Sequence, residues 1–151
     1  MRKTSYMLAA ALITAGFAAP GFLAAHQGAT GIVKQRMDNF KHSQKQLKTV
    51  PQAVSKADYD AVRKTAGWLA EWAARMPEQF PEGSMNPPTE ASPAIWQDFE
   101  DFTAKAEIFR QKSTALGIAA QSGDASAVMS AFQEVAQSCS SCHKLYRIKS
   151  R

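Results

Sequence analysis

The segment Cys139-Ser-Ser-Cys142-His143, close to the C-terminus, constrains the fold of this chain more than any other feature. In an α-helix, residues i, i+3 and i+4 share one face, so both thiols and the imidazole would point to the same side. This order and spacing are typical of covalent c-type haem attachment. Each cysteine adds to one vinyl group of the porphyrin, and the histidine binds the iron. The pattern therefore predicts haem c on Cys139 and Cys142, with His143 as an axial ligand.

Other sites that use paired cysteines fit the sequence less well. A thioredoxin-like redox pair needs a preceding strand in a βαβ context, whereas Val128–Val135 has helical periodicity. A structural zinc site needs about four ligands, and the other histidines, His26 and His42, lie near the opposite end of the chain. Two cysteines in all are also too few for a disulfide framework. Haem attachment is therefore the favoured interpretation.

The N-terminal residues predict export. A basic start at residues 2–3 is followed by an apolar stretch, Met7–Ala18, and then by small residues, which is the pattern of a secretory signal peptide. Pro20 interrupts the apolar stretch, so a cleaved signal is favoured over an uncleaved membrane anchor. We expect residues 1–25 to be removed and residues 26–151 to form one domain in the periplasm, because c-type haem is assembled on the far side of the bacterial inner membrane.

The rest of the chain predicts an all-α fold. Apolar residues recur at alternating steps of three and four, which is the pattern of amphipathic helices that face a core. Pro51 is expected to end the first helix, and Ser55 is expected to cap the second. The narrow, near-heptad stripes are typical of an antiparallel four-helix bundle. The expected helices are Ile32–Thr49, Ser55–Met76, Pro93–Gly123 and Asp124–Lys149.

The segment Pro77–Pro93 separates the two halves of the expected bundle. It holds five of the chain's seven prolines, so we expect a long irregular crossing between the second and third helices. The other two connections are short and require antiparallel neighbours. Because the cysteines and His143 share the inner stripe of the last helix, the one covalently bound haem is expected inside the bundle, as part of its core.

With these elements in place, the sequence resembles the cytochrome c′ family, the class II c-type cytochromes. The resemblance implies a four-helix bundle with one haem attached near the C-terminus. It also covers nearly the whole chain after the signal peptide. The segments that carry it are Val33-Lys34-Gln35-Arg36, Phe80-Pro81-Glu82-Gly83-Ser84, Ala94-Ile95-Trp96 and Cys139–Arg147.

The resemblance also implies what covers the iron. In this family the residue four positions after the arginine that Arg36 matches lies over the distal face. Low-spin members carry a ligating methionine there, and high-spin members carry an apolar residue. This chain has Phe40, so the resemblance implies a five-coordinate, high-spin iron with His143 as its sole axial protein ligand. Met37 lies on roughly the same face and is the alternative sixth ligand; we expect it to fill space beside the haem.

Two arginines each have two interpretations. The resemblance implies that Arg36 pairs with a haem propionate, whereas a stem covering apolar surface is the simpler role. Arg147, one turn after His143, either lies against the proximal imidazole or complements the negative end of its helix. Trp68 and Trp72 could edge the haem or a dimer contact, but we expect them to pack within the bundle.

For function, the resemblance implies a periplasmic electron carrier that exchanges electrons with redox partner proteins. The alternative is the binding of nitric oxide or carbon monoxide at the open distal face. Enzymatic turnover is not expected, because no distal acid or base accompanies the iron. The chain has a net charge of +5, but its basic residues form no patch interleaved with aromatic residues, so nucleic-acid binding is not supported. Many relatives form homodimers through their first two helices, which makes a homodimer a further expectation.

Overall fold

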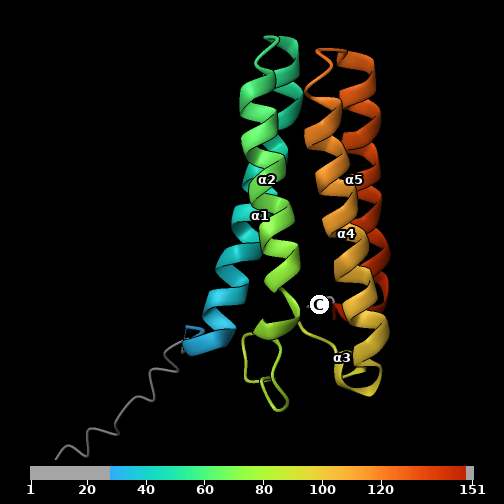
Figure 1. Cartoon of the computed structure of the whole chain (residues 1–151). Coiled ribbons are helices and arrows are strands. Elements are labelled where there is room, and N and C mark those ends of the chain that lie inside the picture. Colours follow the sequence, from blue (N-terminus) through green and yellow to red (C-terminus); the bar gives the residue numbers. More distant parts are fainter. Residues whose placement is uncertain (1–27, 149–151) are drawn as a thin grey trace, which may run out of the picture.

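The computed structural model describes residues 28–148, which form an antiparallel four-helix bundle (Figure 1). The long helices α1 and α2 stand beside α4 and α5, and the crossing segment and α3 lie together at one end of the bundle. The predicted all-α bundle is confirmed, whereas the predicted signal peptide lies outside the described residues. Within residues 28–148, no helix has the length and apolar character needed to cross a membrane. The elements are α1 (Gly31–Ser55), α2 (Tyr59–Arg75), the 3-10 helix η1 (Pro77–Gln79), α3 (Ala94–Gln97), α4 (Phe99–Ala119) and α5 (Ala125–Tyr146).

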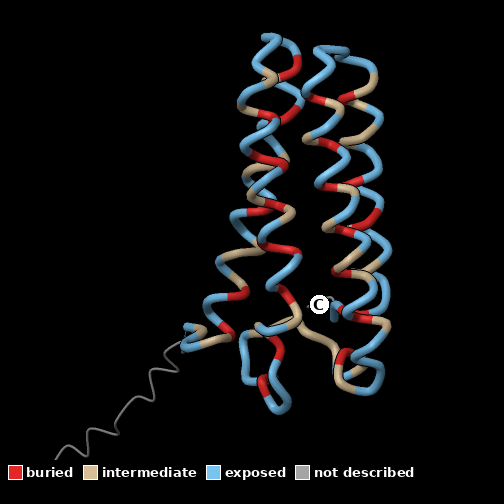
Figure 2. Tube along the Cα trace, viewed as in Figure 1, coloured by how far each residue is buried: buried red, intermediate tan, exposed pale blue. Residues whose placement is uncertain are grey.

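Each long helix buries one apolar stripe, and Figure 2 shows the buried positions recurring along the inner sides of the bundle. The closest packing joins α2 and α4. Small residues permit this approach, because a Cβ atom added at Gly117 would lie 3.4 Å from the Cβ of Ala66. The largest side chains with almost no exposed surface are Trp72, Arg36, Phe102, Leu69, Ile95 and Leu116.

The first helix is longer than predicted. Its expected end at Thr49 was wrong, since α1 continues through Pro51 to Ser55. Proline lacks an N–H group and costs the helix one hydrogen bond to the carbonyl four residues earlier. The last turns survive because Val50 and Val54 are buried, only 1% and 8% exposed, and burying a valine stabilises by about 1.5–3 kcal/mol. Tertiary packing therefore overrides the local signal.

The second helix is capped by a different residue from the one predicted. Ser55 belongs to the end of α1, and its hydroxyl donates to the carbonyl of Gln52 at 2.8 Å. The N-cap of α2 is Asp58, whose carboxylate accepts a hydrogen bond from the N–H of Ala61 at 3.0 Å. Between the two helices, Ala57 has a φ of 55°, in the left-handed region, which lets the chain reverse within a few residues.

The predicted third helix is broken in two. Asp98 leaves the helical conformation, with φ −140° and ψ 71°, and separates α3 from α4. Its carboxylate accepts from the N–H of Asp101 at 3.0 Å, which caps the new helix. The helix also ends at Ala119 rather than Gly123. The predicted start of the last helix is confirmed, since Asp124 caps α5.

The crossing segment is irregular, as predicted, apart from the short helix η1. Its second half pairs with the end of α5. The N–H of Ser92 donates to the carbonyl of Tyr146 at 2.9 Å, and the N–H of Ile148 donates to the carbonyl of Glu90 at 2.8 Å. The crossing segment is thus fixed against the last turn of the helix that carries the cysteines.

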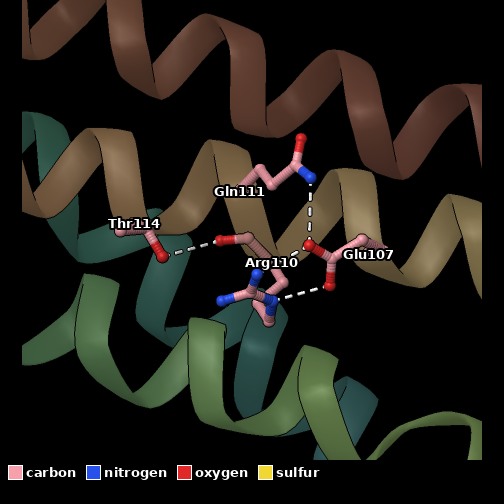
Figure 3. A network of polar contacts seen from close by, with 4 residues as sticks. All are labelled: Glu107, Arg110, Gln111 and Thr114. Atoms are coloured by element: carbon pink, nitrogen blue, oxygen red, sulfur yellow. Dashed lines mark hydrogen bonds and ion pairs between the residues drawn. The ribbon is translucent and has the colours of Figure 1, made fainter.

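A polar network on α4 stabilises that helix locally. Figure 3 shows Arg110 and Gln111 reaching the carboxylate of Glu107, while Thr114 donates to the carbonyl of Arg110. The hydrogen bond from Arg110 lowers the pKa of Glu107 to about 2. All these pairs are three or four residues apart, the spacing at which side chains on one helix meet. None of the four residues lines the cavity described below.

The N-cap assignment of α2 can be tested directly. Replacing Asp58 with Ala removes the acceptor for the N–H of Ala61, and we expect the free energy of unfolding to fall by about 1 kcal/mol. Ser55→Ala is the matched control, and it should change the free energy by less than about 0.5 kcal/mol, because Ser55 caps no helix. Denaturant unfolding of both variants measures the difference. A larger loss in Ser55→Ala would contradict the assignment.

Candidate haem-binding site

A cavity of about 830 Å³ lies between α1, α4, α5 and the crossing segment. This volume falls in the upper part of the range of about 300–1,000 Å³ that is typical of sites for ligands and cofactors. Most of its wall is apolar and aromatic, which suits a large flat ligand with few polar groups. The apolar wall includes Leu47, Met76, Phe80, Ile95, Phe102, Phe109 and Phe132.

One side of the cavity is formed by α5, and the three predicted attachment residues meet there. Cys139, Cys142 and His143 all line it, and neither cysteine is in a disulfide. Burial raises the pKa of both thiols, that of Cys142 to about 11. Both groups are therefore neutral thiols at neutral pH, the form that carries the proton needed to add across a carbon–carbon double bond.

The imidazole of His143 is tuned by burial and by two charged neighbours. Burial lowers its pKa, and the positive charge of Arg147 lowers it further, while the carboxylate of Glu90 acts in the opposite direction. The lowered pKa favours the neutral ring at neutral pH. A neutral imidazole has a free lone pair, which is the form that binds a metal.

The facing side of the cavity is formed by α1. The ring of Phe40 lies 6.3 Å from the ring of His143, centroid to centroid, so these two side chains face each other directly. Phe40 is held by edge contacts with Trp72 at 5.4 Å and Phe80 at 6.4 Å. Met37 also lines the cavity. Phe40 and Met37 therefore both lie on the α1 side of the cavity, and their place over the iron stays a prediction.

Arg36 is deeply buried, only 1% exposed, and its contacts are to the crossing segment. Nη1 donates to the carbonyl of Gln79 at 3.1 Å and to Oγ of Ser84 at 2.7 Å. Nη2 donates to the carbonyl of Ser84 and to Oγ1 of Thr89 at 2.9 Å. The guanidinium also stacks over the ring of Phe80, 4.5 Å from its centroid. All four N–H groups on its terminal nitrogens are thus used by the segment, and its pairing with a propionate stays a prediction.

Arg147 lines the cavity and has a partner that sequence reasoning did not identify. Its guanidinium donates through Nε to Oε2 of Glu90 at 2.6 Å, and Nη2 lies 2.6 Å from the same oxygen. The two predicted roles, contact with the imidazole and helix-end electrostatics, both omitted this ion pair. The general rule that a charged side chain beside a buried site is paired could have pointed to the acidic residue in the crossing segment.

The remaining candidates pack outside the cavity. Trp72 is buried in the core against Phe40, and Trp68 lies beside the exposed His42, with ring centroids 4.2 Å apart. None of Trp68, Trp72 and His42 lines the cavity. The expectation that both tryptophans pack within the bundle agrees with these positions.

Comparisons with known proteins agree with this geometry. The family model for cytochrome c′ matches residues 31–147. Cytochrome c-556 from Agrobacterium fabrum is 32% identical over 124 residues, which cover 80% of this chain and 84% of that protein. Cytochrome c′ from Rhodospirillum rubrum is 36% identical over 80 residues, 52% of this chain and 54% of that protein.

Solved structures extend the match to three dimensions. The crystal structure of cytochrome c′ from Thermochromatium tepidum has a TM-score of 0.72 and 27% identity, and covers 78% of this chain and 95% of that one. A nitric oxide complex of a cytochrome c prime variant from Alcaligenes xylosoxidans has a TM-score of 0.69 and 26% identity, over 78% of this chain and 94% of that one. The chain therefore belongs to the cytochrome c′ family, whose members carry one covalently attached haem c.

Proposed function

We propose that Cys139 and Cys142 hold the haem through thioether bonds and that His143 binds its iron. Three observations support this assignment. Cys139 and Cys142 are the only cysteines of the chain, and both line one cavity together with His143. Burial also keeps the two thiols protonated. In the addition, each sulfur bonds to one vinyl carbon and its proton goes to the other, so no oxidant is needed. When bound, the haem supplies an iron that alternates between the ferrous and ferric states and can take a small ligand.

Within this family, the function we propose is electron transfer in the periplasm, after removal of the signal peptide. The observation that carries it is that the cavity reaches the surface, because its lining includes exposed residues such as Lys41, Lys48 and Arg147. A porphyrin edge in this cavity would lie close to the surface, where a redox partner protein can approach it. The apolar wall keeps water away from the rest of the ring.

A second function, the binding of nitric oxide or carbon monoxide, is favoured by one contact. Phe40 faces His143 across the cavity, and its hydrocarbon ring has no lone pair to give to iron. The position opposite His143 would therefore stay open to a small diatomic ligand. Solved structures of variants of the similar cytochrome c prime from Alcaligenes xylosoxidans contain bound nitric oxide or carbon monoxide.

We propose no enzymatic role and keep the homodimer as a prediction. The α1 side chains that line the cavity include no carboxylate and no histidine, two of the groups that often act as general acids or bases. A dimer through α1 and α2 is implied by the family resemblance alone.

The proposed attachment predicts a strong dependence of folding on the haem. Without the haem, the apolar wall of the cavity of about 830 Å³ would face water, or α1 and α5 would close together. Either change loses the burial of apolar surface that the haem would supply. We expect a Cys139→Ala, Cys142→Ala protein to lack covalent haem and to unfold without a sharp transition. A cooperative melt like that of the wild type, with no haem bound, would contradict the proposal.

The open distal face predicts a change of spin state on substitution. Phe40→Met should place a thioether opposite His143 and shift the iron towards low spin, which electron paramagnetic resonance of the ferric protein measures. Met37→Leu is the control, and it should leave the spin state unchanged, because Met37 is expected only to pack. If the wild type already shows a sulfur-to-iron charge-transfer band, and Met37→Leu abolishes it, then Met37 is the ligand and the gas-binding proposal is wrong.

A further inference from the structure

The helix that carries Phe40 is tied to the crossing segment at Thr89. Arg36 lies one turn before Phe40 in α1, and its Nη2 donates to Oγ1 of Thr89 at 2.9 Å. The same oxygen accepts the N–H of Ala91 at 3.2 Å. Because Arg36 is almost completely buried, its charged guanidinium must be stabilised by hydrogen-bond acceptors such as Thr89. Loss of one acceptor leaves a buried N–H donor unpaired.

The helix that carries His143 is tied to the crossing segment at the next residue. Arg147 lies one turn after His143, and its guanidinium binds the carboxylate of Glu90 at 2.6 Å. Backbone hydrogen bonds reinforce the contact, because the carbonyl of Glu90 accepts the N–H of Ile148 at 2.8 Å. Ala91 and Arg147 also form an antiparallel bridge. The ion pair is half-exposed, but it is part of a connected set of contacts.

These two attachments meet at consecutive residues. Thr89 is bound by the helix on the Phe40 side of the cavity, and Glu90 is bound by the helix on the His143 side. Both residues line the cavity themselves. The direct contacts between α1 and α5 are few compared with those between α2 and α4, which leaves the cavity between them. The segment therefore connects the two faces of the site through two adjacent residues.

We propose that Thr89 and Glu90 form a strap that fixes the spacing of the Phe40 helix and the His143 helix. Both are then positioning residues for the haem: Glu90 acts on the proximal side through Arg147, and Thr89 acts on the distal side through Arg36. This inference rests on the proposed function, in which Phe40 and His143 flank the haem. It has one specific consequence. A change at the proximal attachment should also alter ligand entry on the distal side, because adjacent residues of one segment make the two attachments.

The experiment compares Glu90→Gln with Glu134→Gln in the haem-loaded protein. Glu134 forms a similar interhelical ion pair with Lys112 at 2.8 Å, with side chains 48% and 41% exposed, but it lies outside the cavity lining. We expect Glu90→Gln to move the iron–histidine stretching band in the resonance Raman spectrum and to change the carbon monoxide association rate by about two- to fivefold. Glu134→Gln should change neither.

A second pair of variants tests the other attachment. Thr89→Val keeps the shape of the side chain and removes the acceptor for Arg36, whereas Thr89→Ser keeps the hydroxyl. The strap predicts that Thr89→Val moves the iron–histidine band and that Thr89→Ser does not. If Glu90→Gln fails to load haem, the Thr89→Val and Thr89→Ser pair alone decides the test.

Equal spectra and rates for Glu90→Gln and Glu134→Gln would overturn the strap, as would an unchanged iron–histidine band in Thr89→Val. A failure of the gas-binding proposal looks different, because it appears as a six-coordinate iron in the wild type. In that case the reduction potential of the haem is measured in place of the carbon monoxide association rate. A potential that differs from wild type in Glu90→Gln but not in Glu134→Gln supports the strap, and equal potentials overturn it.

Discussion

The packing of α2 against α4 holds the bundle together, while α1 and α5 make few contacts with each other. Small residues at this contact, such as Ala66 and Gly117, let the two backbones approach each other. One side of the bundle thus has an ordinary protein core. The space left between α1, α4 and α5 is the cavity, and its apolar wall makes a large apolar cofactor part of the folded core. The same arrangement of helices, packed on one side of the bundle and separated on the other, therefore produces both the fold and the site.

Most of the fold follows from helical periodicity, and the exceptions have local causes. The apolar stripes predicted the four long helices, because the buried face repeats every three or four residues, and the prolines of Pro77–Pro93 predicted the irregular crossing. Pro51 and Asp98 were misjudged in opposite directions. Burial of Val50 and Val54 carries α1 past its proline, whereas the carboxylate of Asp98 caps a new helix within a periodic stretch. The local sequence alone could not show whether burial would outweigh a proline, or a capping carboxylate would outweigh periodicity. Burial depends on residues far away in the sequence.

The site was predictable where its chemistry is contained in one helix. The spacing of Cys139, Cys142 and His143 places them on one face without knowledge of the fold. The partners of Arg36 were not predictable in the same way, because Gln79, Ser84 and Thr89 lie 43, 48 and 53 residues further along the chain. A buried arginine demands several acceptors, but an irregular segment rich in proline gives no periodicity from which to choose them.

The central claim is that α1 presents a hydrocarbon ring, and no ligand, to the iron position opposite His143. The absorption spectrum of the ferrous haem-loaded protein, recorded before and after addition of carbon monoxide, tests this claim most directly. The account predicts a five-coordinate, high-spin spectrum that carbon monoxide converts to a six-coordinate, low-spin one. A low-spin spectrum in the absence of carbon monoxide, unchanged when the gas is added, would contradict it.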